Sequence, residues 1–195
     1  MTRPLVVIGS SKGGLRALQS VLSTLSADFN WPIAVAQHRE RDTSSSLVEY
    51  MQKNSALKIR EPEDKEQIEG GIVYLAPADY HLLIDDDHFA LSTAPPKARA
   101  RPSIDVLFES AADAFGSRTV GVILTGANSD GASGLRAIKE AGGLAVVEDP
   151  KTAECGSMPL AALKATSVDE VLSLAEIAPF LNSLCLGETE VTNAV

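Results

Sequence analysis

A short turn near the N-terminus carries the residues whose types and spacing point most directly to chemistry. The segment Gly9-Ser10-Ser11-Lys12-Gly13 fits the pattern G-x-S-x-G, in which a serine lies on a sharp turn between a strand and a helix. Flanking glycines make such a turn sterically possible, and free amides at the start of the next helix favour developing negative charge. The pattern predicts Ser11 as a nucleophile. A phosphate-binding turn remains an alternative, although neither standard glycine-rich phosphate pattern fits, and Ser10 and Ser11 as plain helix caps are another.

A serine nucleophile needs a base, and two further polar residues follow apolar runs typical of buried strands. His38 ends the run that begins at residue 33, and Asp130 lies in the loop after the run 120–124. Because the carboxyl ends of parallel strands meet at one edge of a sheet, we expect Ser11, His38 and Asp130 to meet there. Together they are the parts of an acyl-transfer triad. Taken singly, His38 is as well explained as a structural group and Asp130 as a helix cap, so the coincidence of all three favours catalysis.

Other polar residues compete less well for such a site. Asp149 also follows a predicted strand, but Pro150 after it makes a plain turn an equal interpretation. His81 and His88 fall in a predicted hairpin, away from the strand ends, and we expect both at the surface. The residues therefore favour Asp130 as the carboxylate and His38 as the base, with Asp149 left as a competing carboxylate.

Composition limits the class of protein. The 195 residues suit one domain, 1–195, with a core at about 5–185, and the 45% hydrophobic and 22% charged fractions are those of an ordinary globular protein. No apolar run approaches the ~18–20 residues that span a bilayer, and no secretory signal is visible. With only Cys155 and Cys185, a disulfide framework or a cysteine-based zinc site is not expected. We expect a cytoplasmic protein without membrane insertion.

The charge argues against nucleic acid as a partner. The formal net charge is −9, and most basic residues are scattered along the chain. One local concentration is either a solvated loop or a patch for a carboxylate-rich partner: Lys97, Arg99 and Arg101.

The elements that must position the candidate residues alternate between strand and helix. This order predicts an α/β fold: a doubly wound, mainly parallel sheet with helices on both faces and a small antiparallel hairpin attached to it. Strands are predicted at 5–9, 33–38, 57–59, 72–77, 120–124 and 144–147, with the hairpin at 82–91. Helices are predicted at 13–25, from 43 or 44 to 51, at 104–115 behind the cap Ser103, and at 132–141, 160–164 and 175–185. Residues 187–195 are expected to be frayed.

Five blocks of the sequence resemble, in the same order, the catalytic domain of the chemotaxis protein-glutamate methylesterase family. The resemblance covers about residues 5–185, and the ordered blocks are far more specific than any single motif. The blocks are Ile8–Gly14, Gln37-His38, Tyr74–His81, Arg101–Ser110, and Val120–Gly126 continued by Asp130-Gly131.

This resemblance implies an activity and its residues. Members of the family are serine hydrolases that remove methyl esters from glutamate side chains of chemoreceptor cytoplasmic helices, with deamidation of receptor glutamines as a further activity. Ser11 matches the nucleophile, His38 the base and Asp130 the acid, and no metal or organic cofactor is implied. The chain starts at the catalytic strand, so we expect no receiver domain before it. Control by phosphorylation would then be absent or supplied by a separate response-regulator or chemotaxis protein.

Three departures from the family pattern surround the predicted site. Lys12 replaces the usual threonine, Arg39-Glu40 the common methionine-proline pair, and Ala127 the usual methionine. We expect amides near Lys12 and Ala127 to stabilise the oxyanion, with Gln37 on the substrate side of the site. These departures leave open two alternatives: a non-catalytic module that binds receptor helices, and a related hydrolase with another ester or amide substrate.

Overall fold

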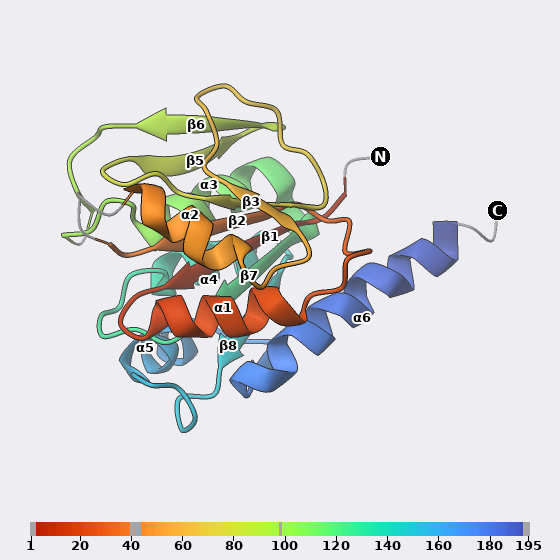
Figure 1. Ribbon diagram of the computed structural model, residues 1–195. Helices are drawn as coiled ribbons and strands as arrows, with labels where there is room; N and C mark the ends of the chain where they lie inside the picture. The colour runs from red at the N-terminus through yellow and green to blue at the C-terminus, as the bar shows by residue number, and fades with distance from the viewer. Residues whose placement is uncertain (1–2, 40–43, 98, 193–195) are drawn as a thin grey trace.

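A computed structural model describes residues 3–39, 44–97 and 99–192. Seven parallel strands form one sheet in the order β3-β4-β2-β1-β7-β8-β9, and two antiparallel strands, β5 and β6, form a second sheet (Figure 1). This confirms the predicted α/β class. The strands are β1 (Leu5–Ser10), β2 (Ile33–Gln37), β3 (Lys58–Arg60), β4 (Ile72–Leu75), β5 (His81–Asp85), β6 (His88–Ser92), β7 (Thr119–Ile123), β8 (Leu144–Glu148) and β9 (Glu170–Leu172). The α-helices are α1 (Gly14–Thr24), α2 (Ser44–Gln52), α3 (Ile104–Phe115), α4 (Ala132–Glu140), α5 (Ser157–Ala165) and α6 (Leu174–Thr192).

The central strand β1 shows why its first four residues, 5–8, are all apolar. Val6 and Ile8 pack on one face of the sheet with residues of α1, α2 and α6, the helices nearest the viewer in Figure 1. Leu5 and Val7 pack on the other face with residues of α3, α4 and α5. Because successive side chains of a strand point to opposite faces, a strand covered on both faces must be apolar at every position.

The strand order brings three loops together. β1 pairs with β2 on one side and with β7 on the other, and the chain fills one half of the sheet before it crosses to the other half. Ligands of open α/β sheets bind where the strand order reverses, at the carboxyl ends of the strands. In this protein the loops after β1, β2 and β7 lie at that point.

The hairpin differs from the prediction in one respect. Among the described strands, β5 and β6 pair with each other alone; the further bridge of β6, from His88 to Gln67, goes to the loop before β4, so the hairpin is not part of the main sheet. Its inner side chains Leu82, Ile84 and Phe89 are buried with residues of α3, and the amide of Ile84 donates to Ser110 Oγ at 3.0 Å. The hairpin therefore covers α3, because its apolar side chains pack on that helix.

The C-terminal region also differs. Residues 187–192 continue α6, where fraying was predicted, while residues 193–195 lie outside the described part. Ile177, Ala178, Leu181 and Cys185 recur at helical spacing and anchor the helix in the core. Once a helix is nucleated, each further residue is added at low cost. Within the described residues, no helix is both long and apolar enough to cross a membrane.

Candidate active site

Ser11 lies on the turn that joins β1 to α1. Its amide donates to the carbonyl of Thr125 in the loop after β7 (3.0 Å), and its carbonyl accepts from the amide of Gly14 (2.9 Å). Gly13 has φ +79°, a left-handed conformation that L side chains rarely adopt. A Cβ on Gly14 would collide with the side chain of Gln37. Both glycines are therefore required by the turn that holds Ser11.

Gln37 ties the two neighbouring strand ends together. It is the register partner of Ser10, and the buried Ser10 hydroxyl donates to its Oε1. Its Nε2 donates to the carbonyl of Ser11 (3.0 Å) and to that of His38 (2.8 Å). Both amide hydrogens are thus engaged with the backbone of the residues that they position.

His38 lies between the other two candidates. Its Nδ1 is 3.1 Å from Ser11 Oγ, and its Nε2 is 2.7 Å from Asp130 Oδ2. Its backbone amide donates to the carbonyl of Ser10 (3.0 Å), which holds the loop after β2 against β1. Ser11, His38 and Asp130 therefore form one chain of hydrogen-bonding distances at the carboxyl edge of the sheet.

The carboxylate of Asp130 is buried at the N-terminus of α3. Its Oδ1 accepts from Ser103 Oγ (2.9 Å) and the Asp105 amide (3.0 Å), and its Oδ2 accepts from the Ile104 amide (2.8 Å). Burial by itself would raise the pKa of Asp130, but the hydrogen bonds from His38 and from the Asp105 and Ile104 amides outweigh it and lower the pKa. An ionised Asp130 accepts a hydrogen bond from Nε2–H of His38, so Nδ1 of the neutral ring carries the lone pair that faces Ser11.

Asp105 lies in the first turn of α3 and accepts hydrogen bonds at the start of α4, as Asp130 does at the start of α3. Its Oδ1 accepts from the amides of Gly131 (2.9 Å) and Gly134 (2.7 Å) at the start of α4. Burial raises the pKa of Asp105. Asp105 was not singled out from the sequence, where its place in the block 101–110 was the only signal.

Asn128 is a second residue that the sequence analysis missed. Its Nδ2 lies 3.1 Å from His38 Nδ1, and its Oδ1 accepts from the Asp130 amide at 3.1 Å. The loop after β7 thus supplies both Asp130 and a side-chain amide to the same imidazole. Nothing in its spacing distinguished Asn128 from an ordinary loop residue.

The prediction for His81 was wrong, whereas His88 is exposed as expected. His81 is only 2% exposed, and its Nδ1 accepts from the backbone amide of Ser103 at 3.2 Å. Because the inner side of the hairpin packs on α3, a residue at the start of β5 is covered. His81 thereby holds the same serine that donates to Asp130.

Two acidic residues lie at the carboxyl end of β8, Glu148 as its last residue and Asp149 directly after it. Glu148 is buried, its carboxylate accepts from the Thr125 amide at 2.7 Å, and burial raises its pKa. It lies behind the Thr125 carbonyl that receives the Ser11 amide. Asp149 Oδ1 accepts from the Lys151 amide at 2.9 Å, which is the geometry of a turn.

Two backbone amides in the loops after β1 and β7 are free to donate. In the described ranges, neither the N–H of Lys12 nor that of Ala127 has an acceptor. The Thr125 hydroxyl donates to the Lys12 carbonyl (3.0 Å) and so connects the loops that carry the two amides. Both residues are exposed.

The side chain of Arg39 is paired within the protein. Its buried guanidinium donates through Nη2 to Glu61 Oε1 and to the carbonyl of Ala76, each at 2.6 Å. Glu40, the other half of this departure from the family pattern, lies outside the described residues.

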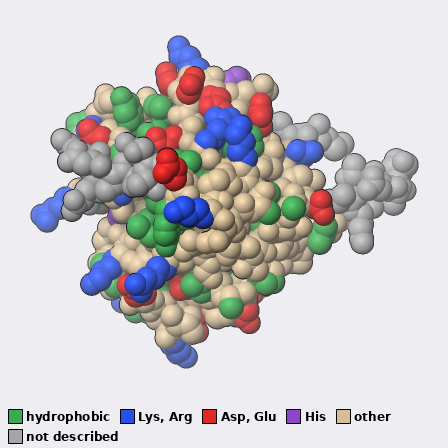
Figure 2. Space-filling view, in the orientation of Figure 1, with side chains coloured by type: hydrophobic (Ala, Val, Ile, Leu, Met, Phe, Trp, Pro, Cys, Tyr) green, Lys and Arg blue, Asp and Glu red, His purple; other side chains and the backbone are tan. Residues whose placement is uncertain are grey.

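A cleft of about 910 Å³ opens from Ser11 and His38 between α1 and α2. Leu15 on α1 and Tyr50 on α2 are among its lining residues and are 42% and 40% exposed. Arg16, Lys53, Glu49 and Glu154 also line it, and Figure 2 shows apolar side chains gathered between α1 and α2 with charged ones of both signs beside them. The cleft therefore offers an apolar strip bordered by both basic and acidic side chains.

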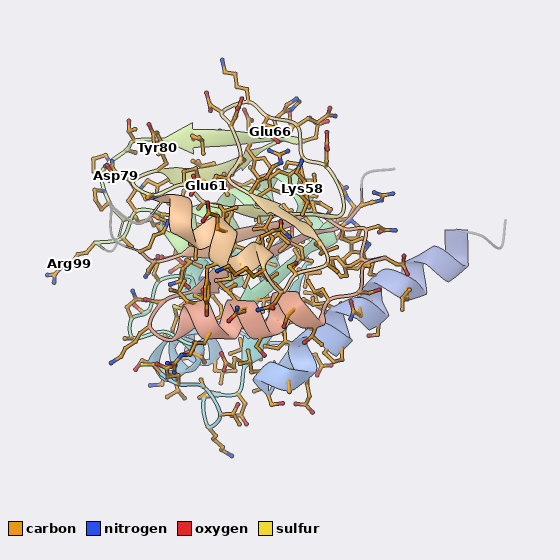
Figure 3. The ribbon with its side chains drawn as sticks, viewed as in Figure 1. Lys58, Glu61, Glu66, Asp79, Tyr80 and Arg99 are labelled. Carbon is orange, nitrogen blue, oxygen red and sulfur yellow. The ribbon has the colours of Figure 1, made fainter. Side chains whose placement is uncertain are left out.

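The basic cluster predicted at residues 97–101 is largely paired within the protein. Lys97 forms an ion pair with Glu109 at 2.6 Å, and Arg101 forms one with Asp79 at 2.6 Å. Arg99 extends outward, away from the body of the protein (Figure 3). In the portion of the chain that the structure describes, no three His, Cys, Asp or Glu side chains are grouped to hold a metal ion.

Comparison with known proteins places this geometry in a family. The profile of the CheB methylesterase family matches residues 6–181. The chain belongs to the CheB methylesterase family. It is 51% identical over 174 residues to a Leptospira interrogans protein named as a candidate protein-glutamate methylesterase/protein-glutamine glutaminase, covering 89% of this chain and 90% of the relative.

More distant CheB relatives agree with this assignment. An Anaeromyxobacter dehalogenans protein-glutamate methylesterase/protein-glutamine glutaminase is 42% identical over 92% of this chain, which spans 52% of that relative. The crystal structure of the Thermotoga maritima CheB methylesterase catalytic domain superposes with a TM-score of 0.90 at 34% identity, covering 94% of this chain and all of that one. This chain thus has both the sequence motifs and the fold of the CheB methylesterase family.

Proposed function

We propose that this protein removes methyl esters from glutamate side chains of chemoreceptor cytoplasmic helices, with deamidation of glutamine side chains as its second reaction. The observation that carries the proposal is the chain of hydrogen-bonding distances from Ser11 through His38 to Asp130, in a member of the CheB methylesterase family. The names of the relatives supply the chemical class of the substrate.

In the first step Ser11 attacks the carbonyl carbon of the ester. The bond from Oγ to carbon forms, the π electrons of the carbonyl move to its oxygen, and the serine proton passes to Nδ1 of His38, 3.1 Å away. The carbonyl then re-forms, and the methoxy group leaves with that proton as methanol. Asp130 stays ionised and stabilises the imidazolium through Nε2–H.

In the second step water takes the place of the serine as nucleophile. His38 removes a proton from the water, which attacks the glutamyl-enzyme, and the same proton is returned to Ser11 as the bond to Oγ breaks. The products are a free glutamate side chain and the original site. A glutamine substrate follows the same path with ammonia as the leaving group.

The oxyanion is assigned to the backbone amides of Lys12 and Ala127. Both amides lack an acceptor among the residues described, and they flank Ser11 from two loops that Thr125 connects. Losing one donor of this kind typically costs about 10²–10³-fold in kcat. Gln37 is a positioning residue, since its side-chain amide donates to the carbonyls of Ser11 and His38.

The cleft between α1 and α2 fits one face of an amphipathic substrate helix. Leu15 and Tyr50 provide an apolar strip, and charged side chains of both signs border it, Arg16 and Lys53 with Glu49 and Glu154, for the polar residues of such a helix. The methylated glutamate of such a helix would enter beside Ser11, where the cleft ends.

The test measures methanol released from a methylated receptor cytoplasmic fragment. We expect release by the wild type and by Ser23→Ala, a serine in α1 whose hydroxyl bonds only its own helix, and loss of at least about 10³-fold in Ser11→Ala. Equal release by wild type and Ser11→Ala would refute the proposal. Tight binding of the fragment without release would favour the non-catalytic module. Reaction of Ser11 with a serine-directed fluorophosphonate without methanol release would favour a hydrolase of another ester or amide.

A further inference from the structure

The side chain of Asn128 has a defined orientation in the loop after β7. Its Oδ1 accepts from the amide of Asp130 at 3.1 Å, and an amide N–H can donate only to the oxygen of the side chain. The nitrogen must therefore face the other way, where it lies 3.1 Å from His38 Nδ1.

Two donors thus share one acceptor on His38. With Nε2–H donating to Asp130, Nδ1 offers a single lone pair, and both Ser11 Oγ and Asn128 Nδ2 lie 3.1 Å from it. In the resting site, Asn128 occupies part of the acceptor that Ser11 needs. By itself this arrangement would weaken the base.

The chemistry changes this competition at the moment of attack. When Nδ1 takes the serine proton, it becomes a donor and can no longer accept from Asn128. At the same moment negative charge forms on the substrate oxygen next to Ser11. Since Ser11 Oγ and Asn128 Nδ2 are each 3.1 Å from the same nitrogen, they lie within about 6 Å of each other. The released N–H therefore has a new acceptor close by.

The surroundings of Asn128 permit this transfer. Asn128 is exposed, the Asp130 amide holds its Oδ1 and leaves Nδ2 on the side of Ser11 and His38, and it follows Ala127, whose amide has no acceptor among the described residues. We propose that the Asn128 side-chain amide is a further oxyanion donor, held on His38 in the resting site and transferred to the substrate oxygen when His38 takes the serine proton. This inference rests on the proposed serine-hydrolase function and adds a catalytic residue to it.

The test uses the rate at which a serine-directed fluorophosphonate labels Ser11, because that reaction also develops charge on an oxygen and needs no receptor. The variants are Asn128→Asp, which keeps the acceptor for the Asp130 amide but has no N–H, and Asn128→Ala. Ser129→Ala, an exposed neighbour in the same loop, is the matched control. We expect labelling about 100-fold slower in both Asn128 variants and unchanged in the control.

The outcomes separate this proposal from the proposed function. Labelling of the Asn128 variants at or above the wild-type rate overturns the oxyanion role while leaving Ser11 as the nucleophile, and a faster rate would identify Asn128 as a competitor only. No Ser11-dependent labelling of the wild type overturns both. A second readout uses the methylated fragment: an oxyanion donor lowers kcat with KM nearly unchanged, whereas misplacement of the loop changes both and lowers the urea midpoint of unfolding.

Discussion

Helices α3 and α4 begin side by side, and each N-terminus is occupied by a carboxylate from the other segment. Asp130, just before α4, accepts from amides of α3, and Asp105, in the first turn of α3, accepts from amides of α4. Both are buried aspartates, and both accept from backbone amides at a helix N-terminus. The pKa shifts are opposite: that of Asp130 is lowered and that of Asp105 is raised.

The difference lies in how many donors each carboxylate has. Asp130 uses both oxygens, for two amides, the Ser103 hydroxyl and His38. Among the described residues, the partners of Asp105 are two amides, both at Oδ1, and the negative charge of Asp130 acts on it as well. Because hydrogen bonds to the charged form oppose the cost of burial, only Asp130 is held firmly as an anion. Hydrogen bonds from a helix N-terminus alone are therefore not enough to keep a buried carboxylate ionised, and the carboxylate partner of an imidazole must be ionised.

The largest effect is expected from Asp130→Asn. An amide has one acceptor oxygen, so its NH₂ group would face donors that the second carboxylate oxygen now satisfies, and His38 would lose the tautomer that presents a lone pair to Ser11. We expect kcat for methanol release to fall about 10⁴-fold. The free energy of unfolding, measured with urea, should fall by about 2–3 kcal/mol.

Asp149→Asn is the matched control for this change. Asp149 also follows a strand, but its Oδ1 bonds only the Lys151 amide, and an asparagine keeps that oxygen. Its activity should equal that of the wild type. If Asp130→Asn kept full activity, the four hydrogen bonds to Asp130 would serve only to cap α3.

The second effect concerns the close approach of the two helices. A Cβ on Gly134 would lie 2.5 Å from Phe108 Cβ and 3.1 Å from Asp105 Cα, so alanine must push α4 away from α3. We expect Gly134→Ala to lower the free energy of unfolding by about 1–3 kcal/mol and to reduce kcat as Asp130 shifts.

Gly187→Ala tests the same substitution where space is open. A Cβ there meets nothing within 4 Å, and the residue lies within α6. Alanine should raise the free energy of unfolding by about 0.5–1 kcal/mol. A loss at Gly187 equal to that at Gly134 would mean that the helix contact is not the cause.

Much of this fold follows from the sequence because its strands are buried on both faces. The runs that became β1, β2, β7 and β8 are continuously apolar, and Ser103 caps α3 with its hydroxyl accepting from the Val106 amide, as predicted. The separate hairpin and the length of α6 were not predictable, because which surface an apolar side covers depends on tertiary packing. The motifs also identified Ser11, His38 and Asp130 as candidate catalytic residues. Their catalytic roles stay a prediction.

The residues that the sequence analysis missed share a property. Asp105, Asn128 and His81 each have a partner 22 to 90 positions away, such as His38 for Asn128 and Ser103 for His81. Local spacing carries no information on such contacts. A buried polar residue can be recognised as buried only when the elements that cover it are known.

The smallest effect, Asp105→Asn, tests the other half of the comparison. The variant keeps Oδ1 for Gly131 and Gly134 and removes a buried charge next to Asp130, so near pH 7 we expect its free energy of unfolding to exceed that of the wild type, on the order of 1 kcal/mol. Because the pKa of Asp105 is raised in the folded state, its protonation stabilises the wild type fully below the ordinary carboxyl pKa of about 4, and this stabilisation is lost as the pH rises through the raised value. The advantage of the variant should therefore shrink as the pH falls from about 7 to about 4 in urea titrations, with Asp149→Asn measured in parallel.

The pH dependence of stability that Asp130 contributes has the opposite sign. Its lowered pKa gives stability above about pH 4 that is lost as the pH falls through the lowered value. An advantage of Asp105→Asn that grew on acidification would mean that Asp105 is held as an anion like Asp130, and the contrast between the two helix N-termini would not stand.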